Sequence, residues 1–164
     1  MERKGFELTD EIRAEVGAES EPWIYEVTTT GIRAFARGVG YEDPIYYDVE
    51  AARAAGYQQL PAPPCYLGTP VYLPGRSDET FSVPTGTGPR PRFGLEHVLD
   101  GGTEAIYERP LMAGDVITMV NKVVDVQTKE SRSLGTMVIV STEASGRAAD
   151  GQVVVRERSQ YIFY

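Results

Sequence analysis

Cysteine and histidine are almost absent from this sequence, which contains one residue of each, Cys65 and His97. A single cysteine cannot form an internal disulfide. Most zinc sites take three or four ligands from Cys, His and carboxylate side chains, and this chain has few of the first two to offer. The sequence therefore predicts neither a disulfide framework nor a metal site, and we expect no cofactor.

Basic residues are also scarce, and no long apolar run is present. The chain has 16 Lys and Arg residues against 24 Asp and Glu residues, which gives a formal net charge of -8. This excess of acid argues against nucleic acid and against an anionic membrane surface as partners. Because we find no apolar run long enough to span a bilayer and no basic-then-apolar leader, we expect no membrane span, no signal peptide and a cytoplasmic location.

Apolar residues, by contrast, make up 41% of the 164 residues, which is enough for a core in one domain, residues 1–164. The first half of the chain reads as helical after a short β-prone run at residues 21–27. Residues 28–40 predict a helix that threonines cap and Gly40 ends, with a buried face of Ile32, Phe35, Ala36 and Val39. Asp48 can cap a second short helix, which Gly56 terminates.

The middle of the chain is rich in proline. Pro63 and Pro64 suit the first turn of a helix, and the apolar residues that follow predict a buried helix over residues 63–73, which Pro70 limits or kinks. Residues 75–91 are rich in Gly, Pro, Ser and Thr without any period. They predict a loop of unusual length, which could serve as a lid or as an interface element.

The second half of the chain is dominated by runs of Val, Ile, Thr and Tyr separated by "DGG", "AGD" and "ADG" turns. These runs predict five antiparallel strands, at residues 92–101, 103–111, 115–130, 134–145 and 151–164. Alternation is clearest in the last run, where one face holds Val153, Val155, Glu157, Ser159, Tyr161 and Phe163. Strands of this length predict a sheet that curls around the apolar helix.

Several segments, taken in their order and spacing, resemble the MaoC-like hydratases and dehydratases of the hot-dog fold. The resemblance is to the N-terminal dehydratase domain of non-catalytic, HadA-type subunits, and it rests on "EPWIYEVTTTGIRAFARGVG", "DPIYYDVEAARAAGY", "LPAPPCYL", "LDGGTEAIYERPLMAGD" and the last three strands. It implies an α+β fold in which a curved antiparallel sheet wraps around a central helix, here residues 63–73. It also implies side-by-side pairing, as a homo-oligomer or as a heterodimer with a catalytic MaoC-like subunit, with an acyl-CoA or acyl-carrier-protein thioester at the junction.

The loop "GYEDPIYYD", residues 40–48, departs from the family's active loop, G-D-x-N-P-L-H. Tyr41 stands where the family has its catalytic Asp, Asp43 where it has Asn, and Tyr46 where it has the catalytic His. A phenol with a pKa near ~10 is a poor base at neutral pH. The resemblance therefore implies that the usual hydration mechanism has no evident base in this chain.

The resemblance also implies a set of substrate-binding residues outside this loop. In the family a backbone N–H at the start of the central helix helps to bind the thioester oxygen. Pro63 and Pro64 have no N–H, so this task would fall to Cys65 or a neighbour. The "DGG" segment, Asp100, Gly101 and Gly102, lies near the family's substrate channel.

Each of these residues also has a structural interpretation. Tyr41 and Tyr46 could pack with their hydroxyl groups hydrogen-bonded. His97 lies close to the "DGG" segment, and histidine is a common general acid or base, so it is a third catalytic candidate; a lone histidine is nevertheless more often structural. Cys65 reads as a small core residue. A last group reads as turn architecture between strands: Arg109, Pro110, Gly114 and Asp115.

Three functions remain open at this point. The favoured one is a substrate-binding, non-catalytic subunit of an (R)-specific enoyl-thioester hydratase or 3-hydroxyacyl-thioester dehydratase. The second is a self-sufficient dehydratase or cyclase that acts on a polyketide-like thioester through Tyr41, Tyr46 or His97. The third is an acyl-thioester binding protein without turnover. The sequence alone leaves open whether the chain is itself an enzyme of the hydro-lyase class.

Overall fold

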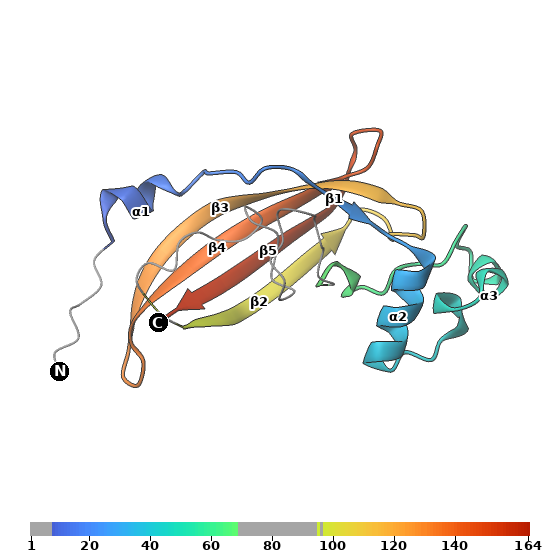
Figure 1. The fold of residues 1–164 in the computed structure, drawn as a ribbon, viewed down its shortest axis with the longest axis horizontal. Helices are drawn as coiled ribbons and strands as arrows, with labels where there is room; N and C mark the ends of the chain where they lie inside the picture. Colours follow the sequence, from blue (N-terminus) through green and yellow to red (C-terminus); the bar gives the residue numbers. More distant parts are fainter. Residues whose placement is uncertain (1–7, 69–94, 96) are drawn as a thin grey trace.

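The computed structural model describes residues 8–68, 95 and 97–164, and it shows a long antiparallel sheet with a group of short helices beyond one end (Figure 1). The sheet has five strands in the order β1-β3-β4-β5-β2. The predicted α+β arrangement is confirmed. The strands are β1 (Trp23–Glu26), β2 (Val98–Tyr107), β3 (Val116–Ser131), β4 (Gly135–Arg147) and β5 (Val153–Phe163). The helices are α1 (Asp10–Ala14), α2 (Thr29–Val39) and α3 (Val49–Ala54), with single 3-10 turns η1 (Pro44–Tyr46) and η2 (Tyr66–Gly68).

Helix α2 begins and ends where its capping residues predict. The Thr28 hydroxyl accepts a hydrogen bond from the backbone N–H of Gly31 at 3.0 Å, and Gly40 ends the helix with a φ of 79°. Ile32 and Ala36 are fully buried, and Phe35 packs against the same core cluster. Val39 was predicted to share this buried face, but it is 50% exposed. It is the last residue of the helix, where the chain already turns into the next loop.

Helix α3 also follows its sequence signals. The Asp48 carboxylate accepts a hydrogen bond from the backbone N–H of Glu50 at 2.7 Å, and Gly56 adopts a φ of 94° just beyond the helix. Together with α2 and η1, this helix lies beyond the end of the sheet where β1 and the arrowhead of β2 are found (Figure 1). The loop between α2 and α3 is therefore anchored on both sides by capped helices.

Strand β2 corrects one part of the predicted strand pattern. The "DGG" segment was expected to be a turn between two strands, but it is a β-bulge inside one strand, with Asp100 paired to Tyr161 and Gly102 paired to Gln160. Glycine permits a bulge as readily as a turn, and Gly102 has a φ of 119°. Because β5 continues unbroken past this point, β2 continues to pair with it. The fifth strand of the sheet is instead β1, from the β-prone run at residues 21–27.

The predicted central helix is only partly within the described residues. Pro63 and Pro64 form a turn in which the Tyr66 N–H donates to the Pro63 carbonyl oxygen at 2.9 Å, and the 3-10 turn η2 follows. Residues 69–73 of that predicted helix, and the predicted loop at residues 75–91, lie outside the described residues. No helix in the described ranges is long and apolar enough to cross a membrane.

One face of the sheet carries two separate hydrophobic clusters. The larger cluster joins the sheet to the helices and contains Ile32, Leu60, Tyr66, Met119 and Val155 among its buried members. The smaller one contains Val138, Val140 and Phe163, near the other end of the sheet. Successive side chains of a strand point to opposite faces, so these residues define the inward face of β4 and β5.

Candidate functional site

The loop between α2 and α3 is held in one conformation by hydrogen bonds from its neighbours. Arg33 of α2 donates from Nε and Nη2 to the carbonyl oxygen of Tyr47, at 3.0 and 2.7 Å. The Tyr47 hydroxyl in turn donates to the carbonyl oxygen of Tyr41 at 2.5 Å. The Asp43 carboxylate accepts from the Ile45 N–H at 3.0 Å and so caps η1. Asp43 therefore has a local structural role whatever else it binds.

The structure brings together the two tyrosines that occupy the family's catalytic positions. The rings of Tyr41 and Tyr46 stack with their centroids 5.7 Å apart and their planes at 27°. Tyr41 is exposed, whereas Tyr46 is half-buried and packs against the larger hydrophobic cluster. A stacked aromatic pair adds about 0.5–1.5 kcal/mol to the burial of its surface. The two rings thus form one aromatic contact across the loop.

The electrostatic surroundings make the ionised form of Tyr46 scarcer at neutral pH than that of an ordinary phenol. Burial raises the pKa of Tyr46 above its ordinary value of 10.0, and the negative charge of Asp43 raises it further. At neutral pH this side chain therefore remains protonated. It can donate a hydrogen bond to a bound group, but it cannot remove a proton from water.

The Pro63 to Cys65 segment is held beside the end of β2. The Tyr107 hydroxyl donates to the carbonyl oxygen of Pro64, and the Ala62 N–H donates to the Leu111 carbonyl oxygen at 2.7 Å. Cys65 was interpreted as a core residue, but its side chain is exposed. Pro63 and Tyr66 fill the buried positions around it, because the tight turn directs Pro64 and Cys65 outward.

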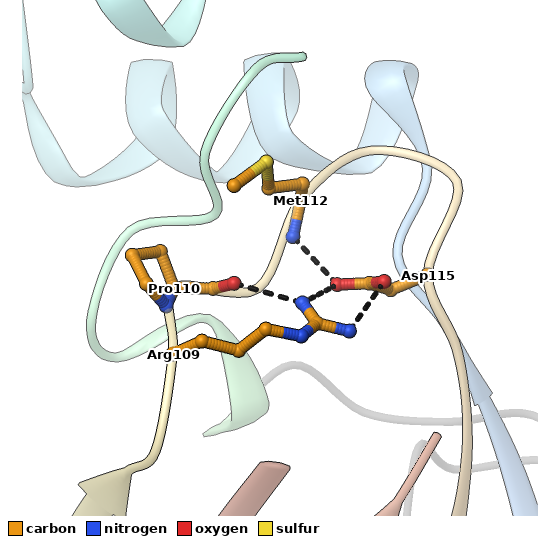
Figure 2. A network of polar contacts seen from close by, with 4 residues as sticks. All are labelled: Arg109, Pro110, Met112 and Asp115. Carbon is orange, nitrogen blue, oxygen red and sulfur yellow. Dashed lines mark hydrogen bonds and ion pairs between the residues drawn. The ribbon is translucent and has the colours of Figure 1, made fainter. Parts of the chain in front are cut away.

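A network of polar contacts fixes the connection from β2 to β3, which in turn supports this segment (Figure 2). Arg109 forms two hydrogen bonds to the Asp115 carboxylate, at 2.7 and 2.9 Å, and a third to the Pro110 carbonyl oxygen at 2.9 Å. The Met112 N–H donates to the same carboxylate at 2.8 Å. The interpretation of these residues as turn architecture agrees with this network.

His97 and the "DGG" segment lie away from the tyrosine pair within this chain. His97 pairs with Tyr164 through two backbone hydrogen bonds, of 3.2 and 3.1 Å, and its ring lies 5.2 Å from the ring of Tyr164. This contact places His97 beside the C-terminus, at the end of the sheet opposite α2 and α3 (Figure 1). The Asp100 carboxylate accepts from the Gly102 N–H at 2.8 Å within the bulge.

Two titratable residues near the Pro63 to Cys65 segment were not predicted from the sequence. Burial raises the pKa of Tyr107 to about 12, and the charges of Glu157 and Cys65 contribute. Burial likewise raises the pKa of the Glu157 carboxyl. The alternation in β5 places Glu157 on the inward face, two residues after the buried Val155, and this was the one signal that could have identified it.

The fold and the sequence together define the class of this protein. The sequence model of the FAS1-like dehydratase domain region matches residues 14–157, so the chain belongs to that family. Among its relatives is a UPF0336 protein of Parafrankia sp. (strain EAN1pec), which is 32% identical over 132 residues. The match covers 79% of this chain and 78% of that protein.

Solved structures with the same fold include two complexes from Mycobacterium tuberculosis. A chain of the C-terminally truncated HadBC (3R-hydroxyacyl-ACP dehydratase) complex matches with a TM-score of 0.65 and 22% identity, over 90% of this chain and 96% of that chain. A chain of the ChsH1–ChsH2 complex matches with a TM-score of 0.69 and 20% identity, over 93% and 87% of the two chains. The assignment to the MaoC-like hydratases and dehydratases of the hot-dog fold is confirmed.

Proposed function

We propose that this chain is the substrate-binding, non-catalytic subunit of an (R)-specific enoyl-thioester hydratase or 3-hydroxyacyl-thioester dehydratase. The observation that carries the proposal is the stacked pair of Tyr41 and Tyr46 at the positions where the family has Asp and His. With its pKa raised by burial and by Asp43, Tyr46 offers a hydrogen-bond donor where the family has its catalytic His. The chemistry then belongs to a partner that keeps the Asp and the His.

The partner in this proposal pairs with the free edge of β2. This strand has a sheet neighbour on one side only among the described residues, and it exposes Val98, Leu99 and Ile106 at 53%, 45% and 50%. A long exposed edge with apolar side chains favours pairing with another strand. That two similar solved structures are complexes supports a second hot-dog domain as the partner, either a catalytic subunit or another copy of this chain.

In this proposal residues 1–164 act as a single domain in the cytoplasm, and an acyl-CoA or acyl-carrier-protein thioester is bound where the two domains meet. The Tyr41 and Tyr46 pair would then shape the channel and hydrogen-bond the substrate or the partner's catalytic groups.

The test compares the purified chain, alone and after co-expression with a MaoC-like chain that has an intact Asp and His, in hydration of crotonyl-CoA. The chain alone should show no appreciable turnover, while the complex should reach rates on the order of 10 s⁻¹, typical of enzymes. A Tyr41→Phe, Tyr46→Phe double variant should raise the KM of the complex, because it removes two hydrogen-bond donors, but it should leave most of the kcat. Substitution of the partner's Asp should abolish it.

Two outcomes would contradict the non-catalytic assignment and favour the other functions. Turnover by the chain alone that the double variant abolishes would indicate a self-sufficient dehydratase or cyclase, and turnover that survives in the variant would point to His97. Tight binding of thioesters without activity in any complex would indicate an acyl-thioester binding protein.

A further inference from the structure

Polar side chains interrupt the inward face of the sheet between its two hydrophobic clusters. On β5 the inward positions run from Val155 through Glu157, Ser159 and Tyr161 to Phe163. The three central ones carry polar groups and both ends are apolar, and the ring of Tyr161 also packs against the smaller cluster. Val155 belongs to the larger cluster and Phe163 to the smaller one. An apolar residue at each central position would bury without a desolvation penalty, so this interruption requires a reason.

The neighbouring strands continue the same pattern at the same level. Thr142 of β4 and Thr103 of β2 lie directly opposite Ser159 on its two sides, and the Thr103 and Ser159 hydroxyl oxygens are 3.0 Å apart. Asp100 of β2 lies opposite Tyr161. We refer to Asp100, Thr103, Thr142, Glu157, Ser159 and Tyr161 as the polar band.

Glu157 is the member of the polar band that has a small side chain opposite it on both neighbouring strands. The residues opposite it are Ala105 on β2 and Ala144 on β4, and residues opposite one another in a sheet have Cβ atoms about 4.5–5.5 Å apart. The Glu157 carboxyl makes no hydrogen bond or ion pair to another described residue. Two small neighbours therefore flank a carboxyl group that retains its capacity for hydrogen bonds.

The polar band also connects two groups of residues that the sequence marked as substrate-binding. At one end Tyr107 follows Ala105 on the same face of β2 and bonds the Pro64 carbonyl oxygen, and its pKa responds to both Glu157 and Cys65. At the other end the band includes Asp100, whose charge acts on Tyr161. The band thus spans the interval from the Pro63 to Cys65 segment to the "DGG" bulge.

We propose that the polar band is an acyl subsite that selects thioesters whose acyl chain carries hydroxyl or keto oxygens over those with an unsubstituted alkyl chain. A ligand hydroxyl donates to the Glu157 carboxyl, and a ligand keto oxygen accepts from the hydroxyl groups of Ser159, Thr103 or Tyr161. A plain alkyl chain leaves the Glu157 carboxyl desolvated and without a hydrogen bond, which costs free energy. The inference rests on the proposed function, because it assumes that this chain binds acyl thioesters.

The test measures, by calorimetry, binding of three saturated C8 acyl-CoA thioesters to the full chain assembled with its partner domain: octanoyl-CoA, its 5-hydroxy form and its 7-hydroxy form. None of the three has a double bond at C2 or a hydroxyl at C3, so none can be hydrated or dehydrated by the proposed reaction. At least one hydroxylated ligand should bind about 10-fold or more tightly than octanoyl-CoA, as one hydrogen bond to a carboxyl group supports. Glu157→Leu should reduce that preference to within about 2-fold.

Two further variants keep the result interpretable. Arg158→Ala alters the adjacent residue on the outer face of β5 and should leave the preference intact. If Glu157→Leu does not fold, the double variant Ser159→Ala, Thr142→Val removes two hydroxyls at nearly constant volume and should still weaken the preference.

Equal binding of all three ligands to the unmodified chain would overturn the inference and leave the proposed function standing. A preference that survives both band variants would overturn it as well. Failure to bind any of the three would instead contradict the proposed function itself, and the inference with it.

Discussion

Tyr107 and Glu157 show how one physical effect has different consequences in two side chains. Burial disfavours the charged form of both groups and so raises both pKa values. For the phenol, a pKa of about 12 means that it remains a neutral donor to the Pro64 carbonyl oxygen throughout the physiological range. For the carboxyl group, the raised pKa means that it loses its proton at a higher pH than an ordinary Glu. The stability of the fold therefore depends on pH through this group.

Glu157→Gln should therefore remove a pH dependence of folding. Because the folded pKa of Glu157 is raised above its ordinary value of 4.5, its favourable contribution is fully present below that value and is lost as the pH rises through the folded pKa. The variant should be more stable than the unmodified chain at pH 8 and should lose this advantage near pH 4. Urea melts across that range would measure it, with Glu143→Gln as the control on the outer face. Parallel curves for the two chains would refute the expectation.

Asp115 should show the opposite pH dependence. Burial raises the pKa of Asp115, but the hydrogen bonds from Arg109 and from the Met112 N–H outweigh it, so the pKa lies below the ordinary value of 3.8. Its stabilisation is present above that value and is lost as the pH falls through the folded pKa. Asp115→Asn should cost about 1–2 kcal/mol of unfolding free energy at pH 7, allowing for partial exposure of the pair.

The cost of Asp115→Asn should shrink in melts below pH 4. The matched control is Glu50→Gln, which removes an ion pair to Arg53 whose side chains are 74% and 53% exposed. It should change stability by less than about 0.5 kcal/mol. An equal effect of the two substitutions would show that the network in Figure 2 is no stronger than a surface pair.

At the scale of one element, α2 contains two glycines with different surroundings. A Cβ atom on Gly31 would lie 2.2 Å from the Tyr66 hydroxyl oxygen, whereas one on Gly38 would meet no atom within 4 Å. Gly31→Ala should therefore displace Tyr66 and destabilise the chain by about 1–3 kcal/mol. Gly38→Ala should stabilise it by up to ~1 kcal/mol, since alanine is the better helix former.

Thermal melts of the two alanine variants would test this contrast within one helix. Because Tyr66 belongs to the segment that follows Pro63 to Cys65, Gly31→Ala should also weaken thioester binding, and Gly38→Ala should not. Equal and small effects would mean that Tyr66 moves aside without cost.

At the scale of the whole molecule, the exposed edge of β2 predicts that the chain is not a monomer. Leu99 and Ile106 both point to the outer face of this strand, opposite Ile162 and Arg156 of β5. Replacing both with lysine should favour the monomer, because charged residues on an edge strand oppose pairing with another strand. Val124→Lys, on β3, exposes a lysine away from this edge and should leave assembly unchanged.

Sedimentation or light scattering of the purified chain, alone and with a candidate partner, would measure these states. A stable unmodified monomer that binds an acyl thioester without any second domain would contradict the prediction that the chain assembles with a partner. So would a double lysine variant that assembles as well as the unmodified chain.

The sequence by itself determined the elements whose signals are local. The bounds of α2 and α3 follow from Thr28, Gly40 and Asp48, because a cap bonds a backbone group only two or three residues away. The sequence also sufficed to predict the family and to show that this chain departs from the family's active loop, because Tyr41 and Tyr46 lie in one short segment. The three long C-terminal strands follow from runs rich in Val, Ile, Thr and Tyr between turn signals, with clear alternation in the last run.

Only the tertiary structure decided what depends on neighbours far along the chain. Whether "DGG" is a turn or a bulge depended on how far β5 continues to pair, and whether Cys65 is buried depended on which face of its turn meets Tyr66 and the sheet. The polar band could not be seen in any one strand, because its members come from β2, β4 and β5. Pairing and burial are free energies of contact between distant segments, and no window of sequence contains both partners.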